Sequence, residues 1–139
     1  DGVRNDMLGE VSALFDERVD RPPIETITAA IAIVVDRIAR DPGRAHILLA
    51  QHVGSSPLQD RRAVALQEAT QLVVEASRPH LREDADETAL RMDTLVAVGG
   101  FVEVITAWHS GLLAVTEKEV VAHTSRLAET LAQRYVVSG

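Results

Sequence analysis

The side chains of this sequence best suited to catalysis or metal binding are its five histidines, His46, His52, His80, His109 and His123. Two ligands on one face of a helix must lie three or four residues apart, and no pair of these histidines has that spacing. The sequence contains no cysteine, which excludes thiolate catalysis and cysteine-ligated metals. A metal site is therefore not expected.

Serine chemistry has no signature either. A serine nucleophile needs a nearby histidine that a carboxylate orients, often on a Gly-x-Ser-x-Gly turn, and that turn does not occur. A Gly-x-Gly-x-x-Gly phosphate loop does not occur either. We therefore predict that the chain is not an enzyme and needs no cofactor.

Residues 92–113 form the most unusual segment, a helical pattern that is apolar on more than one face. A helix that packs on one side needs a single apolar stripe about 100° wide. This segment carries one apolar line through positions 95, 98, 102 and 105 and another through 92, 96 and 99. The excess apolar surface indicates a subunit interface in addition to a core.

Two features of that segment have more than one interpretation. Gly99 and Gly100 lie inside the helical pattern, where each glycine costs about 1 kcal/mol relative to alanine. They either allow close approach of another helix, open a cavity, or are a tolerated weak point. Glu103 lies among apolar residues, and a carboxylate buried there must be paired or protonated. It either contacts a ligand or an arginine such as Arg91 or Arg126, or faces water at a helix edge.

Prolines and glycines divide the chain into six predicted helices that would position these residues. The helices span about 5–19, 23–40, 43–53, 57–77 and 86–111, and a last helix follows Thr116 with an apolar face that extends to Tyr135. Thr116 and Glu119 have the spacing of a capping box. Because no alternating strand pattern occurs, we predict an all-α fold, a six-helix orthogonal bundle in a single domain, residues 1–139.

Composition restricts the class of protein further. Apolar residues make up 46 % of the chain and aromatic residues 3 %, a balance that favours packed helices. The formal net charge of −7 makes this stretch by itself a poor nucleic-acid binder. Neither a run of about 20 apolar residues nor a signal peptide is present, so we expect no membrane contact and a cytoplasmic location.

A set of inward-facing apolar and mildly polar residues on the earlier helices is suited to a small-molecule pocket. A solid core has the same pattern, and periodicity does not separate the two. The candidate ligand-binding residues are Val11, Phe15, Ile31, Val35, His46, Leu49, Leu66, Thr70, Val73, Met92, Val96 and Glu103.

The order of these elements resembles the C-terminal, ligand-binding and dimerisation domain of tetracycline-repressor-type (TetR-like) transcriptional regulators. The resemblance rests on residues 44–57, which join two helices, on residues 95–108, and on the closing helix at 116–127. It covers nearly the whole chain. The helix-turn-helix of the family would precede Asp1, so DNA binding is expected only through that missing N-terminal domain.

The resemblance implies a homodimer in which the last two helices of each subunit form a four-helix bundle. It also implies a repressor that releases DNA when a small hydrophobic effector changes the spacing of its two DNA-binding heads. Two alternatives stay open: a helical protein-interaction module without a small-molecule site, and an enzyme or metal carrier that uses scattered histidines and Glu103. The dimer-interface residues implied are Leu95, Val98, Val102, Ile105, His109, Val120, Thr124, Leu127, Leu131 and Tyr135.

Overall fold

The chain folds into α-helices. The computed structural model describes residues 2–18, 20–41 and 56–137. Within these ranges the helices are α1 (Gly2–Glu17), α2 (Pro23–Arg40), α4 (Ser56–Ser77), α5 (Glu87–His109) and α6 (Glu117–Ala132), with a 3-10 turn, η1 (Arg78–His80), after α4. The β-structure of the described ranges is one isolated antiparallel bridge between Leu81 and Val136. The predicted all-α class is confirmed; the predicted helix 43–53, with His46 and Leu49, lies outside the described residues.

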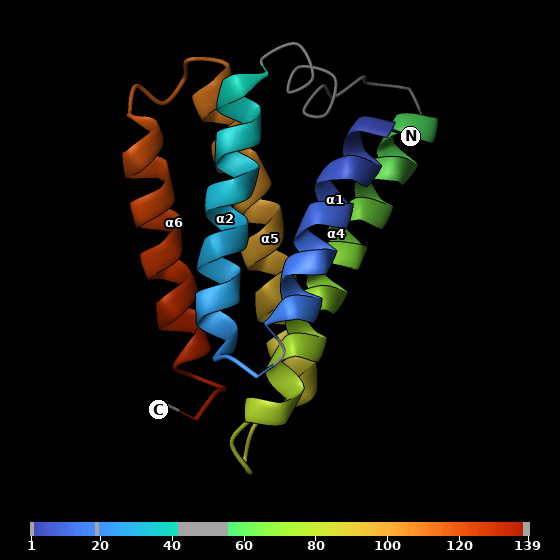
Figure 1. Cartoon of the computed structure of the whole chain (residues 1–139), viewed down its shortest axis with the longest axis vertical. Helices are drawn as coiled ribbons and strands as arrows, with labels where there is room; N and C mark the ends of the chain where they lie inside the picture. Colours follow the sequence, from blue (N-terminus) through green and yellow to red (C-terminus); the bar gives the residue numbers. More distant parts are fainter. Residues whose placement is uncertain (1, 19, 42–55, 138–139) are drawn as a thin grey trace.

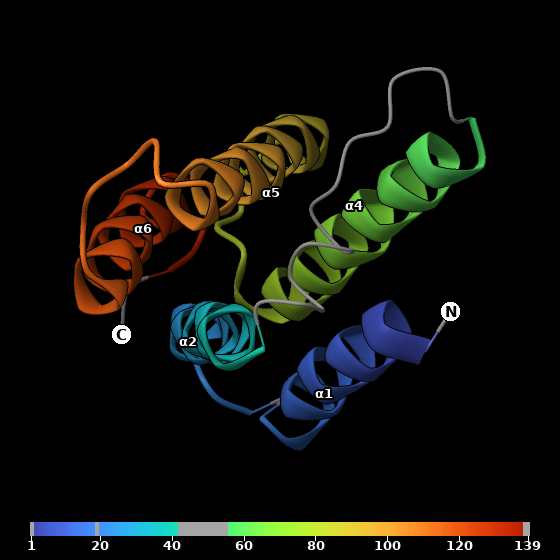
Figure 2. The same ribbon diagram turned by 90° about the horizontal axis from the view of Figure 1, so that it is seen from above.

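Helix α2 stands at the centre of the bundle (Figure 1). It packs most extensively on α6 and also contacts α1, α4 and α5. Seen from above, α1 and α4 lie side by side away from α6, and α5 lies between α4 and α6 (Figure 2). None of the described helices is long and apolar enough to cross a membrane.

The bounds of α2 are those predicted from the sequence. Pro22 precedes the helix with an extended backbone. Pro23 occupies its first turn, where a backbone N–H has no acceptor within the helix and its absence in proline costs no hydrogen bond. Val35 and Ile38, in the last two turns of the helix, are buried against Ile105 of α5 and Val120 of α6. This cluster forms the main core of the bundle and joins the three helices α2, α5 and α6.

A second, smaller core lies at the other end of α5. Val74 of α4, Leu90 of α5 and Tyr135 are buried together there, with Leu81 and Val136 packed against them. The prediction that the last helix carries Tyr135 on its face is wrong, because α6 ends at Ala132. The backbone leaves the helix to pair with the segment after η1: the N–H of Arg82 donates to the carbonyl of Tyr135 over 2.9 Å.

Local interactions define the ends of α5 and α6. Asp86 caps α5 by accepting hydrogen bonds from the N–H groups of Thr88 and Ala89 over 2.9 and 3.2 Å. The helix ends at His109, two residues earlier than predicted, because Gly111 adopts a positive φ of 88°, the left-handed geometry that terminates helices. The predicted capping box at the start of α6 is confirmed, with both reciprocal hydrogen bonds present.

Candidate functional site

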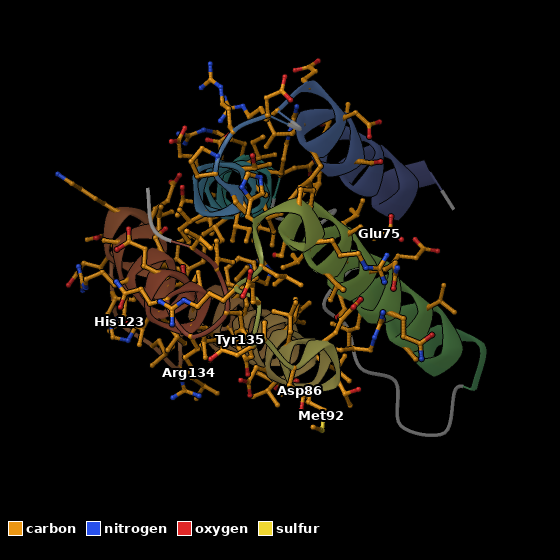
Figure 3. The ribbon with its side chains drawn as sticks, turned by 90° about the horizontal axis from the view of Figure 1, so that it is seen from below. Glu75, Asp86, Met92, His123, Arg134 and Tyr135 are labelled. Atoms are coloured by element: carbon orange, nitrogen blue, oxygen red, sulfur yellow. The ribbon has the colours of Figure 1, made fainter. Side chains whose placement is uncertain are left out.

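Helix α5 exposes apolar side chains to solvent as well as burying them. Its inner side carries Leu90, Thr94 and Ile105, all buried. On the opposite side, Met92, Leu95 and Val96 are 59 %, 45 % and 73 % exposed. Figure 3 shows Met92 projecting away from the ribbon at the edge of the molecule. The steps of three and four residues from position 92 continue this side through the glycine pair to Glu103. We call Met92, Leu95, Val96, Gly99, Gly100 and Glu103 the outer face of α5.

The glycine pair lies in open space. A Cβ atom added at Gly99 or at Gly100 would meet nothing within 4 Å outside the helix itself. Packing among the described residues therefore gives no reason for glycine at either position, although each weakens the helix relative to alanine. Of the interpretations of the glycine pair given above, close approach by a helix from outside the described residues is consistent with this open space.

Glu103 is the charged residue of the outer face, and Arg91 borders that face. Glu103 is exposed, so its carboxylate is not a buried charge. Arg91 is also exposed, and its Nη1 donates a hydrogen bond to Oε1 of Gln71 on α4 over 2.8 Å. An arginine has five N–H donors, so this bond leaves donors for further contacts.

The ten predicted dimer-interface residues divide into two groups. Ile105 and Val120 are buried in the main core, and Tyr135 is buried in the smaller one. Thr124 is buried too, and its Oγ1 donates to the carbonyl of Val120 over 2.7 Å. These four side chains lie inside the subunit and offer little area to a second one. The remaining six keep exposed area, with Leu95 and Leu127 exposed and Val98, Val102, His109 and Leu131 half-buried.

The outward side of α6 differs from that of α5. Apart from Leu127, the exposed positions of α6 are small, polar or charged: Lys118, Glu119, Ala122, His123, Arg126, Glu129 and Thr130. Figure 3 shows His123 at the outer edge of α6. Of these two helices, α5 therefore carries more of the exposed apolar side chains.

The predicted ligand-binding residues are brought together only in part. Seven of them lie on α1, α2 and α4, which contact one another pairwise: Val11, Phe15, Ile31, Val35, Leu66, Thr70 and Val73. Met92, Val96 and Glu103 lie instead on the outer face of α5. Val35 is fully buried in the main core, and the hydroxyl of Thr70 donates to the carbonyl of Leu66 in its own helix over 2.7 Å. Neither of these two side chains faces an open space.

Two grooves of the described surface flank α1, and both are open to solvent. The groove between α1 and α4 has a volume of about 280 Å³ and is lined by Ser12, Glu68, Gln71, Leu72 and Glu75. The groove between α1 and α2 has about 270 Å³ and is lined by Glu10, Ala32, Ile33, Asp36 and Arg37. Neither contains a predicted ligand-binding residue, and carboxylates contribute to both linings.

A polar contact ties the end of the chain to α5. The hydroxyl of Tyr135 donates to Oδ2 of Asp93, and Nη1 of Arg134 lies 3.7 Å from the same oxygen. The hydrogen bond to Asp93 raises the pKa of Tyr135 above its ordinary value. Sequence reasoning missed Asp93, because its partner is 42 residues away.

Electrostatic contacts elsewhere hold helices together. Arg37 of α2 donates to Glu10 of α1 over 2.8 Å, and this hydrogen bond raises the pKa of Arg37. Arg78 of η1 donates to Glu87 of α5 over 2.7 Å, with the same effect on its own pKa. Both pairs are exposed to solvent and screened, so they position helices more than they stabilise the fold.

The described residues contain no group of three or more histidines and carboxylates that could hold a metal ion. The outer face of α5 is therefore the candidate functional site. Comparisons of the chain with protein-family models, with curated proteins and with solved structures find no match.

Proposed function

We propose that this chain is the dimerisation and effector-binding domain of a transcriptional regulator of the tetracycline-repressor type. The outer face of α5 carries the proposal. Large exposed apolar surfaces of soluble proteins often mark interaction sites, and Met92, Leu95 and Val96 are all exposed on adjacent turns of one helix. In the proposed assembly, α5 and α6 pack against the same two helices of a second subunit.

The effector, a small hydrophobic molecule, binds between α1, α2 and α4 in this proposal. Phe15, Ile31, Leu66 and Val73 support this location, because they are half-buried apolar residues on three helices that contact one another. An effector that separates these helices would change the spacing of two DNA-binding heads, which must match successive major grooves. Binding would thereby release the DNA.

A second candidate function is a helical protein-interaction module without an effector site. The burial of Val35 and Thr70 favours it, as do the charged side chains in both grooves beside α1. This candidate shares the interface on α5 with the first. The two differ only in whether a small molecule binds.

Sedimentation of the chain at micromolar concentration tests the dimer. We expect a dimer for the unchanged chain and a monomer for Val96→Glu, which would bury an unpaired charge in the interface. Ala13→Glu, a charge introduced at an exposed position of α1 outside the proposed four-helix bundle, is the control and should leave the dimer intact. A clean monomer for the unchanged chain would contradict the proposed dimerisation.

Thermal unfolding with a panel of apolar and cationic compounds tests the effector site. A ligand at about 100 times its Kd adds about 2.7 kcal/mol, which raises the Tm by several degrees for a domain of this size. Leu66→Trp, which fills the space between α1, α2 and α4, should abolish that shift. If no compound raises the Tm while the chain remains a dimer, the second candidate function replaces the first.

A further inference from the structure

We infer that the outer face of α5 binds the same face of a second copy of this chain with the two helices antiparallel. In this arrangement Leu95 and Val96 of each copy pack against Gly100 and Gly99 of the other. The inference rests on the dimerisation proposed above and adds the direction and register of the helix pair. Its twofold axis passes between positions 97 and 98.

The order of large and small residues along the outer face favours this direction. Met92, Leu95 and Val96 are bulky and come first, and Gly99 and Gly100 follow them by one turn. In a parallel pair, bulky side chains would meet bulky side chains and glycines would meet glycines, leaving a gap at one level and crowding at the other. An antiparallel pair sets bulky residues against glycines at both levels. This also accounts for a glycine pair that the packing within one copy does not require.

Charge supports the same direction and selects a second copy as the partner. Arg91 precedes the apolar residues and Glu103 follows the glycines, so the outer face has a cation at one end and an anion at the other. Each lies about 8–10 Å along the helix axis from the midpoint of the pair, given a rise of about 1.5 Å per residue. The antiparallel pair brings Arg91 of each copy to the level of Glu103 of the other, and it also sets the two helix dipoles in opposite directions. The parallel pair would instead align like charges.

The chain offers a clean test, because it contains no cysteine. In the proposed register the two copies of residue 96 are about 4–5 Å apart along the axis, within reach of a disulfide, whereas the two copies of residue 92 are about 16 Å apart. Val96→Cys should therefore form a covalent dimer on mild oxidation. Met92→Cys alone and Glu103→Cys alone should not, but an equal mixture of these two variants should give the mixed dimer.

The outcomes separate this inference from the dimerisation on which it rests. If Met92→Cys and Glu103→Cys each cross-link to themselves as well as Val96→Cys does, the helices are parallel and the inference is overturned. If the chain sediments as a dimer but Val96→Cys stays reduced at the level of an Ala122→Cys control, the interface lies elsewhere. If a lipid surface or another protein covers this face, the unchanged chain sediments as a monomer, and both proposals fail.

A charge exchange gives an independent readout of the register. Arg91→Glu should raise the Kd of the dimer about tenfold, because two new carboxylates approach Glu103 of the opposite copy. Adding Glu103→Arg to the same chain should restore the Kd of the unchanged protein. The hydrogen bond of Arg91 to Gln71 is lost in both variants, so recovery reports the contact between copies. A double variant as weak as the single one contradicts the register.

Discussion

Helices α5 and α6 are consecutive in the chain, yet they distribute their apolar residues differently. Helix α6 buries Val120 and Thr124 on one side and directs mainly polar and charged residues outward. Helix α5 buries Leu90 and Ile105 and still exposes Met92 and Val96. The contacts within one copy account for the pattern of α6, because each side of that helix meets the solvent or core that its residues suit. For α5, these contacts account for the buried side of the helix but not for the apolar residues on its exposed side.

The beginnings of the two helices differ as well. Asp86 alone caps α5 by accepting two backbone hydrogen bonds. At the start of α6, Thr116 and Glu119 cap each other's backbone N–H groups. Helix α6, which begins with the capping box, is the amphipathic one, and α5, which has the simpler cap, contacts both cores. The two helices therefore begin with different local signals, although both pack extensively on the rest of the bundle.

The largest expected effect separates the two sides of α5. Ile105→Ala should cost about 2–5 kcal/mol of unfolding free energy, since the side chain is 1 % exposed and its removal leaves a cavity in the main core. Val96→Ala on the outer face should change the stability of the monomer by less than about 0.5 kcal/mol. Urea unfolding, at a protein concentration low enough for the dimer to dissociate, measures the free energy of unfolding of both variants. Similar losses for the two variants would break the distinction between the faces.

A smaller effect is expected where the end of the chain meets α5. Tyr135→Phe removes the hydrogen bond to Asp93 and should cost about 1–2 kcal/mol. The pKa of Tyr135 is raised in the folded state, so its contribution is fully present below the ordinary value of 10.0 and is lost as the pH rises through the folded value. Unfolding measured between pH 8 and about pH 11 should show an alkaline loss of stability that the variant lacks. An unchanged alkaline profile in Tyr135→Phe would contradict this.

The two caps should contribute comparably in spite of their different geometry. Thr116→Ala and Asp86→Ala should each cost about 1 kcal/mol in chemical unfolding. The α6 cap should depend on pH, because hydrogen bonds from Thr116 lower the pKa of Glu119. That contribution is present above the ordinary value of 4.5 and is lost as the pH falls through the lower folded value. Glu119→Gln should flatten the stability profile below about pH 5, and an unaltered slope there would argue against the capping box.

The smallest expected effects come from exchanging glycine and alanine at exposed positions, and they have opposite signs on α5 and α6. Gly100→Ala should stabilise the isolated subunit by up to about 1 kcal/mol, because the new Cβ meets no neighbour and alanine favours the helix. Ala122→Gly at an exposed position of α6 should destabilise it by a similar amount. Unfolding measured on monomeric protein compares them. Destabilisation by Gly100→Ala would mean that this position is constrained within one copy.

Most of the fold could be predicted from local patterns. The bounds of α2, the stop at Ser77 and the capping box depend on residues within four positions of one another, and all three agree with the structure. The end of α6 could not be predicted in this way. Its apolar spacing continues to Tyr135, but the backbone there pairs with Arg82 and His80, far away in the sequence.

For the candidate site, the sequence predicts an excess of apolar residues but not which of them are exposed. Periodicity marked α5 as apolar on more than one side, but it could not show which side faces the core. Met92 and Val96 were assigned to a pocket and lie on the surface, while Ile105 was assigned to an interface and lies in the core. A single apolar stripe shows which side of a helix faces the core, whereas two apolar stripes are compatible with two orientations.

Composition and contacts within one or two turns therefore account for the all-α class, most of the helix bounds and the excess of apolar residues on α5. The packing of distant segments sets the rotation of α5, the burial of Tyr135 beside Val74 and Leu90, and the open space around Gly99 and Gly100. Those properties depend on which distant helices compete for the same surface. In α5, the contacts with α2 and α4 occupy one apolar side and leave the other exposed.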